Sequence, residues 1–192
     1  AELQAIDDGG VLTETGRLIS QFPLDPRLGK MLVTGAKLGA VREMLVIVAL
    51  LSIQDPRERP EDKRQAADEK HRQWLDKESD FASILKLWEH FEEQRQALTK
   101  RKFADYCHKN FVSYLRMREW RDLVHQFHLS LRALGVKENA QPAGYEAVHQ
   151  SILSGLLGHV GFRHEEKEFL GVRNRKFHVF PGSGLAKNPP KW

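Results

Sequence analysis

The string Asp68-Glu69-Lys70-His71 contains residue types that can hold a divalent cation. In the D-E-x-H pattern, an acidic pair holds Mg²⁺ at the end of an apolar strand beside a phosphate-binding loop. Here the string instead continues the polar run Lys63-Arg64-Gln65-Ala66-Ala67, which has the composition of a surface helix. We therefore expect these residues to lie on a polar helix and to have no catalytic role.

Other catalytic patterns are incomplete. Gly29-Lys30 is the only Gly-Lys pair, and it lacks the remaining residues of the G-x-x-x-x-G-K-[ST] phosphate loop. His125 and His128 lie three residues apart, but no third metal ligand follows at a matching spacing. Gly182-Ser183-Gly184 lacks the strand-to-helix turn of a nucleophilic serine and indicates a flexible loop. For this chain alone we predict no catalytic, cofactor-binding or metal-binding residues and no enzyme activity.

A row of basic side chains is the most informative feature. On a helix over residues 116–134, five of them share the face opposite the apolar one: Arg118, Arg121, His125, His128 and Arg132. Such a face is either a solvated surface or a contact for nucleic-acid phosphates, which Lys and Arg bind with release of counterions. More cations precede this helix and favour the second interpretation: Lys100, Arg101, Lys102 and Lys109.

Helical patterns must position these residues. Thr13 is expected to cap a short helix that stops at Phe22-Pro23. Asp25-Pro26 places a capping carboxylate before a first-turn proline, and the helix that it begins runs to Gly39. Residues 42–53 are apolar nearly all round, as in a central core helix.

The second half of the chain continues this alternation of helices and loops. Residues 54–60 form a charged loop bracketed by prolines, and a polar helix follows from Glu61. Apolar stripes predict amphipathic helices over residues 81–91 and 120–134, and a further helix covers about 145–158.

Beyond Gly161 the apolar residues no longer follow the helical spacing. Short apolar runs at 168–172 and 176–180, separated by Arg173-Asn174-Arg175, predict two strands joined by a turn. Because a lone hairpin is only marginally stable in water, these strands must pack on the helices or belong to a sheet whose other strands are missing from the sequence. The second option predicts that the chain is a piece of a longer protein.

Composition and charge set wider limits. The 41% hydrophobic and 29% charged fractions are those of a soluble globular protein, and no apolar run approaches the roughly 20 residues that span a bilayer. Without a visible secretory leader, we expect a cytoplasmic protein that does not enter membranes, with Cys107 as a buried apolar residue. The net charge of +4 is uneven: residues 1–26 carry one basic and five acidic side chains, and residues 100–132 carry eight and three.

A resemblance to a known family extends over nearly the whole chain. Its most specific part is Ser52-Ile53-Gln54-Asp55-Pro56-Arg57-Glu58-Arg59-Pro60, continued by Asp62-Lys63, Asp68-Glu69-Lys70-His71 and Asp76-Lys77-Glu78-Ser79-Asp80-Phe81. It also includes Pro23-Leu24-Asp25-Pro26-Arg27-Leu28, Asn110-Phe111, Tyr114-Leu115-Arg116-Met117-Arg118-Glu119-Trp120 and Pro181-Gly182-Ser183-Gly184-Leu185. In these segments the chain resembles the bacterial HrpA type of DEAH-box RNA helicase.

The resemblance implies a fold. In that family such residues follow two RecA-like motor domains. The chain would contain the end of a winged-helix domain at 1–25, a ratchet-like helicase-associated helical bundle at 26–160, and the first strands of an OB-fold at 161–192. The expected fold class is therefore mainly α, with a helical bundle between a short winged-helix remnant and a partial OB-fold β segment.

The resemblance also implies a function. Members of the family unwind RNA with ATP, and single-stranded RNA runs between the motor domains and a cover made by the bundle and the OB-fold. This chain would supply the cover, with single-stranded RNA and the motor domains of the same parent as partners. ATP and Mg²⁺ would be bound by the motor domains. The alternative is an interaction scaffold that docks motor domains or protein cofactors and has little RNA affinity of its own.

RNA contact is expected at nine residues, from their charge, the basic helix face and their place within the resemblance. They are Arg57, Arg59, Lys63, Asn110, Arg116, Arg118, Arg121, Lys176 and Lys187. These side chains would track the phosphate backbone, with stacking but without reading of base edges.

Overall fold

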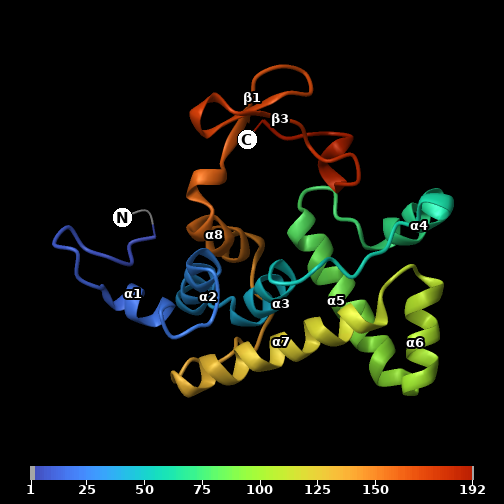
Figure 1. The fold of residues 1–192 in the computed structure, drawn as a ribbon, viewed down its shortest axis with the longest axis horizontal. Helices are drawn as coiled ribbons and strands as arrows, with labels where there is room; N and C mark the ends of the chain where they lie inside the picture. The colour runs from blue at the N-terminus through green and yellow to red at the C-terminus, as the bar shows by residue number, and fades with distance from the viewer. Residues whose placement is uncertain (1–2, 192) are drawn as a thin grey trace. The chain divides into compact units, whose positions relative to one another are not determined.

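Helices make up most of the regular structure in the computed structural model, which describes residues 3–191 (Figure 1). They are α1 (Glu14–Ile19), α2 (Pro26–Leu38), α3 (Val41–Leu51), α4 (Arg64–His71), α5 (Asp80–Ala97), α6 (Lys100–Lys109), α7 (Tyr114–Ala133) and α8 (Tyr145–Gly155). A small antiparallel sheet of order β1-β2-β3 follows, made of β1 (Gly161–Arg163), β2 (Phe169–Gly171) and β3 (Lys176–Phe177). The predicted fold class, mainly α with a short β segment at the C-terminal end, is confirmed.

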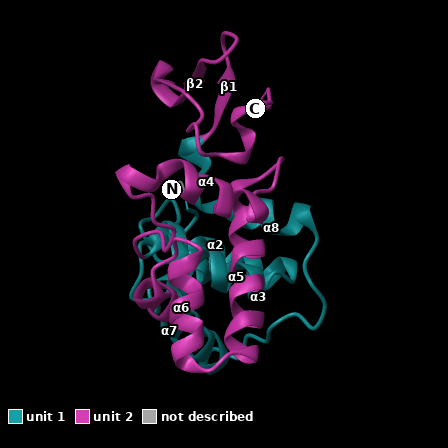
Figure 2. Cartoon of the chain, turned by 90° about the vertical axis from the view of Figure 1, so that its right-hand side faces the viewer, with its two compact units in different colours: residues 1–52, 121–159 teal, residues 53–120, 160–192 magenta. Residues whose placement is uncertain are grey.

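The chain forms two compact units, coloured separately in Figure 2. Unit 1 consists of Ala1–Ser52 and Arg121–His159, and unit 2 of Ile53–Trp120 and Val160–Trp192. Helix α7 therefore begins in unit 2 and ends in unit 1. Both units combine segments that are distant in sequence, so they follow spatial contacts and not the predicted order of domains. The predicted boundaries after residues 25 and 160 stay a prediction.

The first two helices begin with the caps expected from the sequence. The Thr13 hydroxyl accepts a hydrogen bond from the Gly16 amide at 3.0 Å, and the Asp25 carboxylate accepts one from the Arg27 amide at 2.8 Å. Helix α2 ends at Gly39, whose φ of 69° lies in the left-handed region that glycine adopts without strain. These local signals set the helix ends before any tertiary contact is considered.

The core of unit 1 is built around α3 and the close approach of α2 and α8. Met44 and Ile47 on α3 are fully buried, which confirms the predicted core helix. On α8, a Cβ at Gly155 would lie 2.4 Å from the Arg27 carbonyl oxygen and 2.8 Å from Met31 Cγ. Only glycine lets the two helix backbones come this close.

The core of unit 2 is aromatic. The ring of Phe91 on α5 lies 5.2 Å from that of Trp74 and 6.3 Å from that of Phe103 on α6, measured between centroids. Trp88 meets the fully buried Trp120 edge-on at 4.9 Å. Such tilted and edge-on pairs stabilise a core beyond the area that they bury.

Helix α6 and strand β1 were not predicted. Helix α6 buries only two of its side chains, Phe103 and Cys107, so few apolar residues mark it in the sequence. Strand β1 has three residues and therefore no period that can be recognised. Cys107 is buried as predicted, and burial raises the pKa of its thiol to about 12, so it stays protonated and unreactive.

None of the helices within residues 3–191 combines the length and the apolar character required to cross a bilayer.

Candidate nucleic-acid interface

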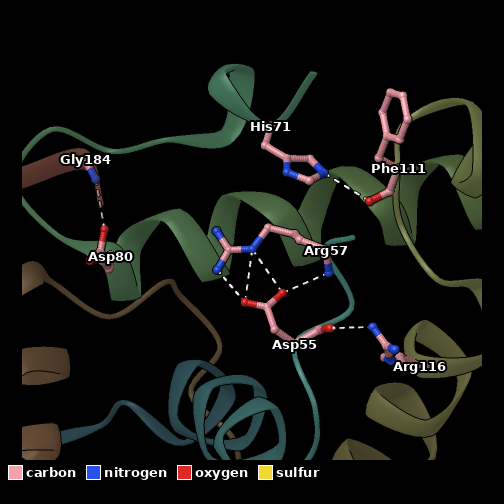
Figure 3. Close-up of polar contacts among 7 residues, drawn as sticks. All are labelled: Asp55, Arg57, His71, Asp80, Phe111, Arg116 and Gly184. Carbon is pink, nitrogen blue, oxygen red and sulfur yellow. Dashed lines mark hydrogen bonds and ion pairs between the residues drawn. The ribbon is translucent and has the colours of Figure 1, made fainter. Parts of the chain in front are cut away.

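The loop before α4 is organised by the pair Asp55 and Arg57 (Figure 3). The Asp55 carboxylate accepts hydrogen bonds from the Arg57 amide at 2.8 Å, from Nε at 3.0 Å and from Nη2 at 2.6 Å. The carboxylate thus binds both the backbone and the guanidinium of the same residue. Pro56, fully buried between the two, fixes the turn.

Main-chain hydrogen bonds join this loop to the segment that follows α6. The Glu58 amide donates to the Phe111 carbonyl at 2.8 Å, and the Ser113 amide donates to the Pro56 carbonyl at 2.8 Å. Phe111 has a φ of 54°, an unusual value for a residue with a side chain, which turns the chain between the two bonds. Two segments about fifty residues apart in sequence are thereby paired as a short antiparallel bridge.

Two further side chains hold this pairing in place (Figure 3). His71, at the end of α4, shares a hydrogen bond of 3.0 Å between Nε2 and the Phe111 carbonyl. Because a carbonyl only accepts, the neutral ring must carry its proton on Nε2. Arg116 donates from Nη1 to the Asp55 carbonyl at 3.1 Å.

The charges of this network are set by burial and by pairing. Burial opposes the charged forms of both Asp55 and Arg57, but their mutual hydrogen bonds and opposite charges outweigh it. The pKa of Asp55 is therefore lowered and the pKa of Arg57 raised. Burial lowers the pKa of His71, against the opposing effect of its hydrogen bond to Phe111, so the ring is neutral near pH 7.

Three of the residues predicted to contact RNA lie inside this network or beside it. Arg57 and Arg116 have side chains only 29% and 28% exposed, and both bind Asp55. Asn110 is buried, and its side-chain amide donates to the Tyr106 carbonyl at 2.9 Å. These three side chains position the loop, and their assignment to RNA stays a prediction.

Arg59 lies at the rim of the network. Its guanidinium forms two bonds of 2.7 Å to the Asp68 carboxylate on α4. The same guanidinium lies over the ring of Phe180, with Cζ 6.0 Å from the ring centroid. Asp68 and His71 thus lie on a helix, as predicted, and both have internal partners.

The segment Pro181-Gly182-Ser183-Gly184-Leu185 is anchored on the start of α5. The Gly184 amide donates to Asp80 Oδ1 at 3.1 Å (Figure 3). A Cβ at Gly184 would lie 1.8 Å from the Asp76 carbonyl oxygen, so the backbones touch at this point. The sequence predicted a flexible loop here. Its anchoring could not be predicted from local patterns, because the contact comes from residues about a hundred positions away.

The other predicted cations differ in exposure and pairing. Lys63, at the end of the 3-10 turn η1 (Glu61–Lys63), and Lys187, after η5 (Gly184–Ala186), are exposed, and neither has an ion pair within the described residues. Lys176 on β3 forms an ion pair of 2.9 Å with Glu168, although 62% of its side chain is exposed.

The predicted basic face of α7 is not part of the buried side of the helix. Helix α7 buries Met117, Trp120, Phe127 and Leu131, and none of the five predicted basic residues is buried. Arg118 is exposed, and Arg121 Nη2 lies 3.7 Å from Oδ1 of the neighbouring Asp122. The face is not purely cationic, because His128 contacts the Glu138 carboxylate.

Eight of the nine predicted residues belong to unit 2, and Arg121 belongs to unit 1. Lys77 and Phe180, which no sequence pattern singled out, lie beside the segment 181–185 or directly before it. Phe180 closes an apolar run that predicted a strand, but β3 ends at Phe177. Phe180 therefore lies outside the strand pairing, and its ring is exposed.

Comparison with known proteins identifies the family. Residues 25–111 match the family described as "Helicase associated domain (HA2), ratchet-like", and residues 1–24 match "Helicase associated domain (HA2), winged-helix". The chain is 49% identical to the ATP-dependent RNA helicase HrpA of Escherichia coli over 94% of its own length. It is 48% identical to the HrpA homolog of Haemophilus influenzae over 95%.

A more distant relative is the pre-mRNA-splicing factor ATP-dependent RNA helicase prp22 of Schizosaccharomyces pombe, which is 28% identical over 99% of the chain. The chain spans only 14% of the length of the two bacterial relatives and 16% of the fission-yeast relative. The two helicase-associated matches together cover more than half of the chain. The chain therefore corresponds to the helicase-associated accessory region of HrpA-type helicases.

Proposed function

We propose that this chain is the accessory RNA-binding region of an ATP-dependent DEAH-box RNA helicase. In the parent protein it covers the path of single-stranded RNA above the motor domains, which bind ATP and Mg²⁺. The strands β1 to β3, an antiparallel meander, are the first strands of an OB-fold in this proposal. The proposal rests on the likeness to HrpA-type helicases over nearly the whole chain.

The observation that best supports RNA binding is that unit 2 contains two kinds of cationic side chain, those bound to internal acceptors and those that are exposed. Arg57 and Arg116 are held by internal acceptors, whereas Lys63 and Lys187 are exposed and have no ion pair within the described residues. Exposed, unpaired cations can neutralise phosphates without first breaking a contact. The internally bonded arginines hold the loop that precedes Lys63.

The decisive experiment is fluorescence anisotropy of a labelled single-stranded RNA of about 12 nucleotides, titrated with the chain at three salt concentrations. For single strands the logarithm of the association constant falls with the logarithm of salt by about 0.7 per phosphate contact. The double variant Lys63→Glu/Lys187→Glu is expected to weaken binding at least about tenfold and to lower the slope by about 1.4.

A matched control carries the same change of net charge in unit 1. The variant Arg17→Glu/Arg42→Glu also reverses two exposed cations, and we expect it to retain most of the affinity. Equal losses in the two variants would show that only net charge matters and would refute the assignment to Lys63 and Lys187. Absence of binding by the wild-type chain at the lowest salt would refute autonomous RNA binding.

One observation favours a second function, that of a scaffold that docks motor domains or protein cofactors with little RNA affinity of its own. Unit 1 has an apolar hollow of about 300 Å³, lined mainly by Leu18, Phe22, Val33, Ala36, Leu131, Leu134 and Val136. Apolar hollows at a surface are typical sites of protein docking. Salt separates the two functions, because apolar docking responds little to salt and phosphate binding responds strongly.

A further inference from the structure

Phe180 is an exposed aromatic residue in a basic part of the chain. With 65% of its surface exposed, it is among the most exposed large apolar residues of the described chain. It lies outside β3, so neither sheet pairing nor a core explains its position. Single exposed apolar residues are common on protein surfaces, so the exposure of Phe180 gains its meaning from the residues around the ring.

The ring is held from one side by a fixed cation. The Arg59 guanidinium lies over the ring at 6.0 Å from the centroid, and two bonds of 2.7 Å to Asp68 restrict its movement. Cation and ring attract each other through the ring quadrupole. Because the guanidinium covers one face and the residue remains 65% exposed, ring surface is left for a second planar group.

The loop that carries the ring is preorganised. The Ser183 amide donates to the Phe180 carbonyl at 2.9 Å, and the Gly184 amide donates to Asp80 at 3.1 Å. A Cβ at Gly182 would approach Cε1 of the ring to 2.7 Å, so the turn packs directly against the edge of the ring. The ring therefore loses little conformational freedom when a ligand binds.

Two exposed lysines flank this loop. Lys77 lies beside Gly184, since a Cβ at that glycine would be 3.7 Å from Lys77 Cα, and Lys187 directly follows η5. Within residues 3–191 neither lysine has an ion pair. An open aromatic face on a loop with exposed cations beside it matches the chemistry of single-stranded nucleic acid, in which unpaired bases alternate with phosphates.

We propose that Phe180 is a stacking platform for one unpaired nucleobase, with Lys77 and Lys187 contacting the adjacent phosphates. This inference rests on the proposed RNA-binding function and adds the residue on which a base stacks. Every base has a π-face, so the platform accepts all four bases and adds affinity without sequence preference. Arg59 acts in this arrangement as the support of the ring and not as a phosphate ligand.

The first test compares variants of Phe180 in binding to a 12-nucleotide oligouridine, whose bases stack little on one another. Phe180→Ala is expected to weaken binding at least about fivefold, which corresponds to ~1 kcal/mol, the low end for a stacked base. Phe180→Leu keeps apolar area but lacks a π-face and should lose as much. Phe180→Tyr should bind within about twofold of the wild type.

The salt dependence separates stacking from charge. Because Phe180 contacts no phosphate, its variants should keep the wild-type slope, whereas Lys77→Gln/Lys187→Gln should lower it by about 1.4. Phe162→Ala is the matched control, a phenylalanine 46% exposed on β1. Wild-type affinity of Phe180→Leu, or an equal loss in Phe162→Ala, would overturn the platform.

A second measurement decides the question even if oligouridine binding is too weak to measure. In NMR spectra of the chain with labelled phenylalanine rings, millimolar uridine monophosphate is expected to shift the Phe180 resonance, which is assigned by its absence in Phe180→Leu. No shift of this resonance would refute the platform. If the wild-type chain does not bind oligouridine but uridine monophosphate clearly shifts the Phe180 resonance, the proposed RNA-binding function is refuted and the stacking platform is not.

Discussion

At the scale of single residues, the same tripeptide occurs in two environments. Asp25-Pro26-Arg27 and Asp55-Pro56-Arg57 form the same contacts, with the arginine amide donating to the aspartate at 2.8 Å in both and Nη2 at 2.8 and 2.6 Å. The first pair begins α2 at the surface, where the Arg27 side chain is 49% exposed, and the second holds a loop, where the Arg57 side chain is 29% exposed. Solvent screens the first pair more than the second.

This repetition gives a matched pair of substitutions. Arg57→Ala is expected to lower the free energy of unfolding by about 1–2 kcal/mol, because Asp55 loses the guanidinium and keeps only the amide of residue 57; the value is discounted for the partial exposure of Asp55. Arg27→Ala should cost less than about 0.5 kcal/mol. Urea unfolding of the two variants measures both values, and equal costs would contradict a structural role for Arg57.

His71 makes the stability of the chain depend on pH. Its pKa in the folded chain lies below the ordinary value of 6.5, so at mildly acidic pH the unfolded chain binds a proton that the folded chain does not. Its contribution is therefore fully present above about pH 6.5 and is lost as the pH falls towards the lowered pKa. The carboxylates whose pKa values are lowered, including Asp55, change the free energy of unfolding only below about pH 4.

The measurement is the free energy of unfolding by urea between pH 7.5 and 5. We expect it to fall across this range in the wild type. In His71→Gln, whose side-chain amide can still donate to the Phe111 carbonyl and does not titrate, the fall should be smaller. An unchanged pH dependence in this variant would assign the effect to other groups.

At the scale of elements, the β segment is fixed to helices by a loop and not only by its own strand pairing. A sheet with strands of two or three residues is too small to be stable alone, and the anchored loop joins it to α5 within unit 2. The close contact of Gly184 with Asp76 is possible only for a residue without a side chain. The glycine thus contributes a contact surface and not a turn.

Gly184→Ala is expected to detach this loop. The new methyl group would overlap the Asp76 carbonyl oxygen, so the loop must move and the bond to Asp80 is lost. Amide hydrogen exchange at residue 184 should become at least about fivefold faster, as expected for a hydrogen bond of ~1 kcal/mol. Gly171→Ala, where a Cβ meets its nearest neighbour at 3.4 Å, is the control and should retain wild-type exchange at residue 184.

At the scale of the whole molecule, the excess of positive charge is local. Residues 161–192 carry seven basic and three acidic side chains, and residues 1–26 carry one and five. A polyanion such as RNA therefore meets an attractive surface on some segments and a repulsive one on others. This is the reason that reversal of two cations in unit 2 and in unit 1 is expected to give unequal losses in the salt titrations.

The sequence alone determined most of the helices and their ends. Caps such as Thr13 and Asp25, the left-handed Gly39 and the apolar period of α3 act through neighbours within a few residues, so they can be read from spacing. Helix α6 was missed because only two buried side chains mark it, and β1 because three residues show no period. The family resemblance was likewise carried by contiguous residues, and the comparisons confirmed it.

Only the tertiary structure decided which cations are available. Arg57, Arg116 and Lys63 look alike in the sequence, but two of them are bound by acceptors that other segments or the fold of the loop supply. The anchoring of Gly184 and the exposed ring of Phe180 also depend on partners far away in the chain. The physical reason is that ion pairing and exposure are properties of the space around a side chain, and spacing along the sequence does not specify that space.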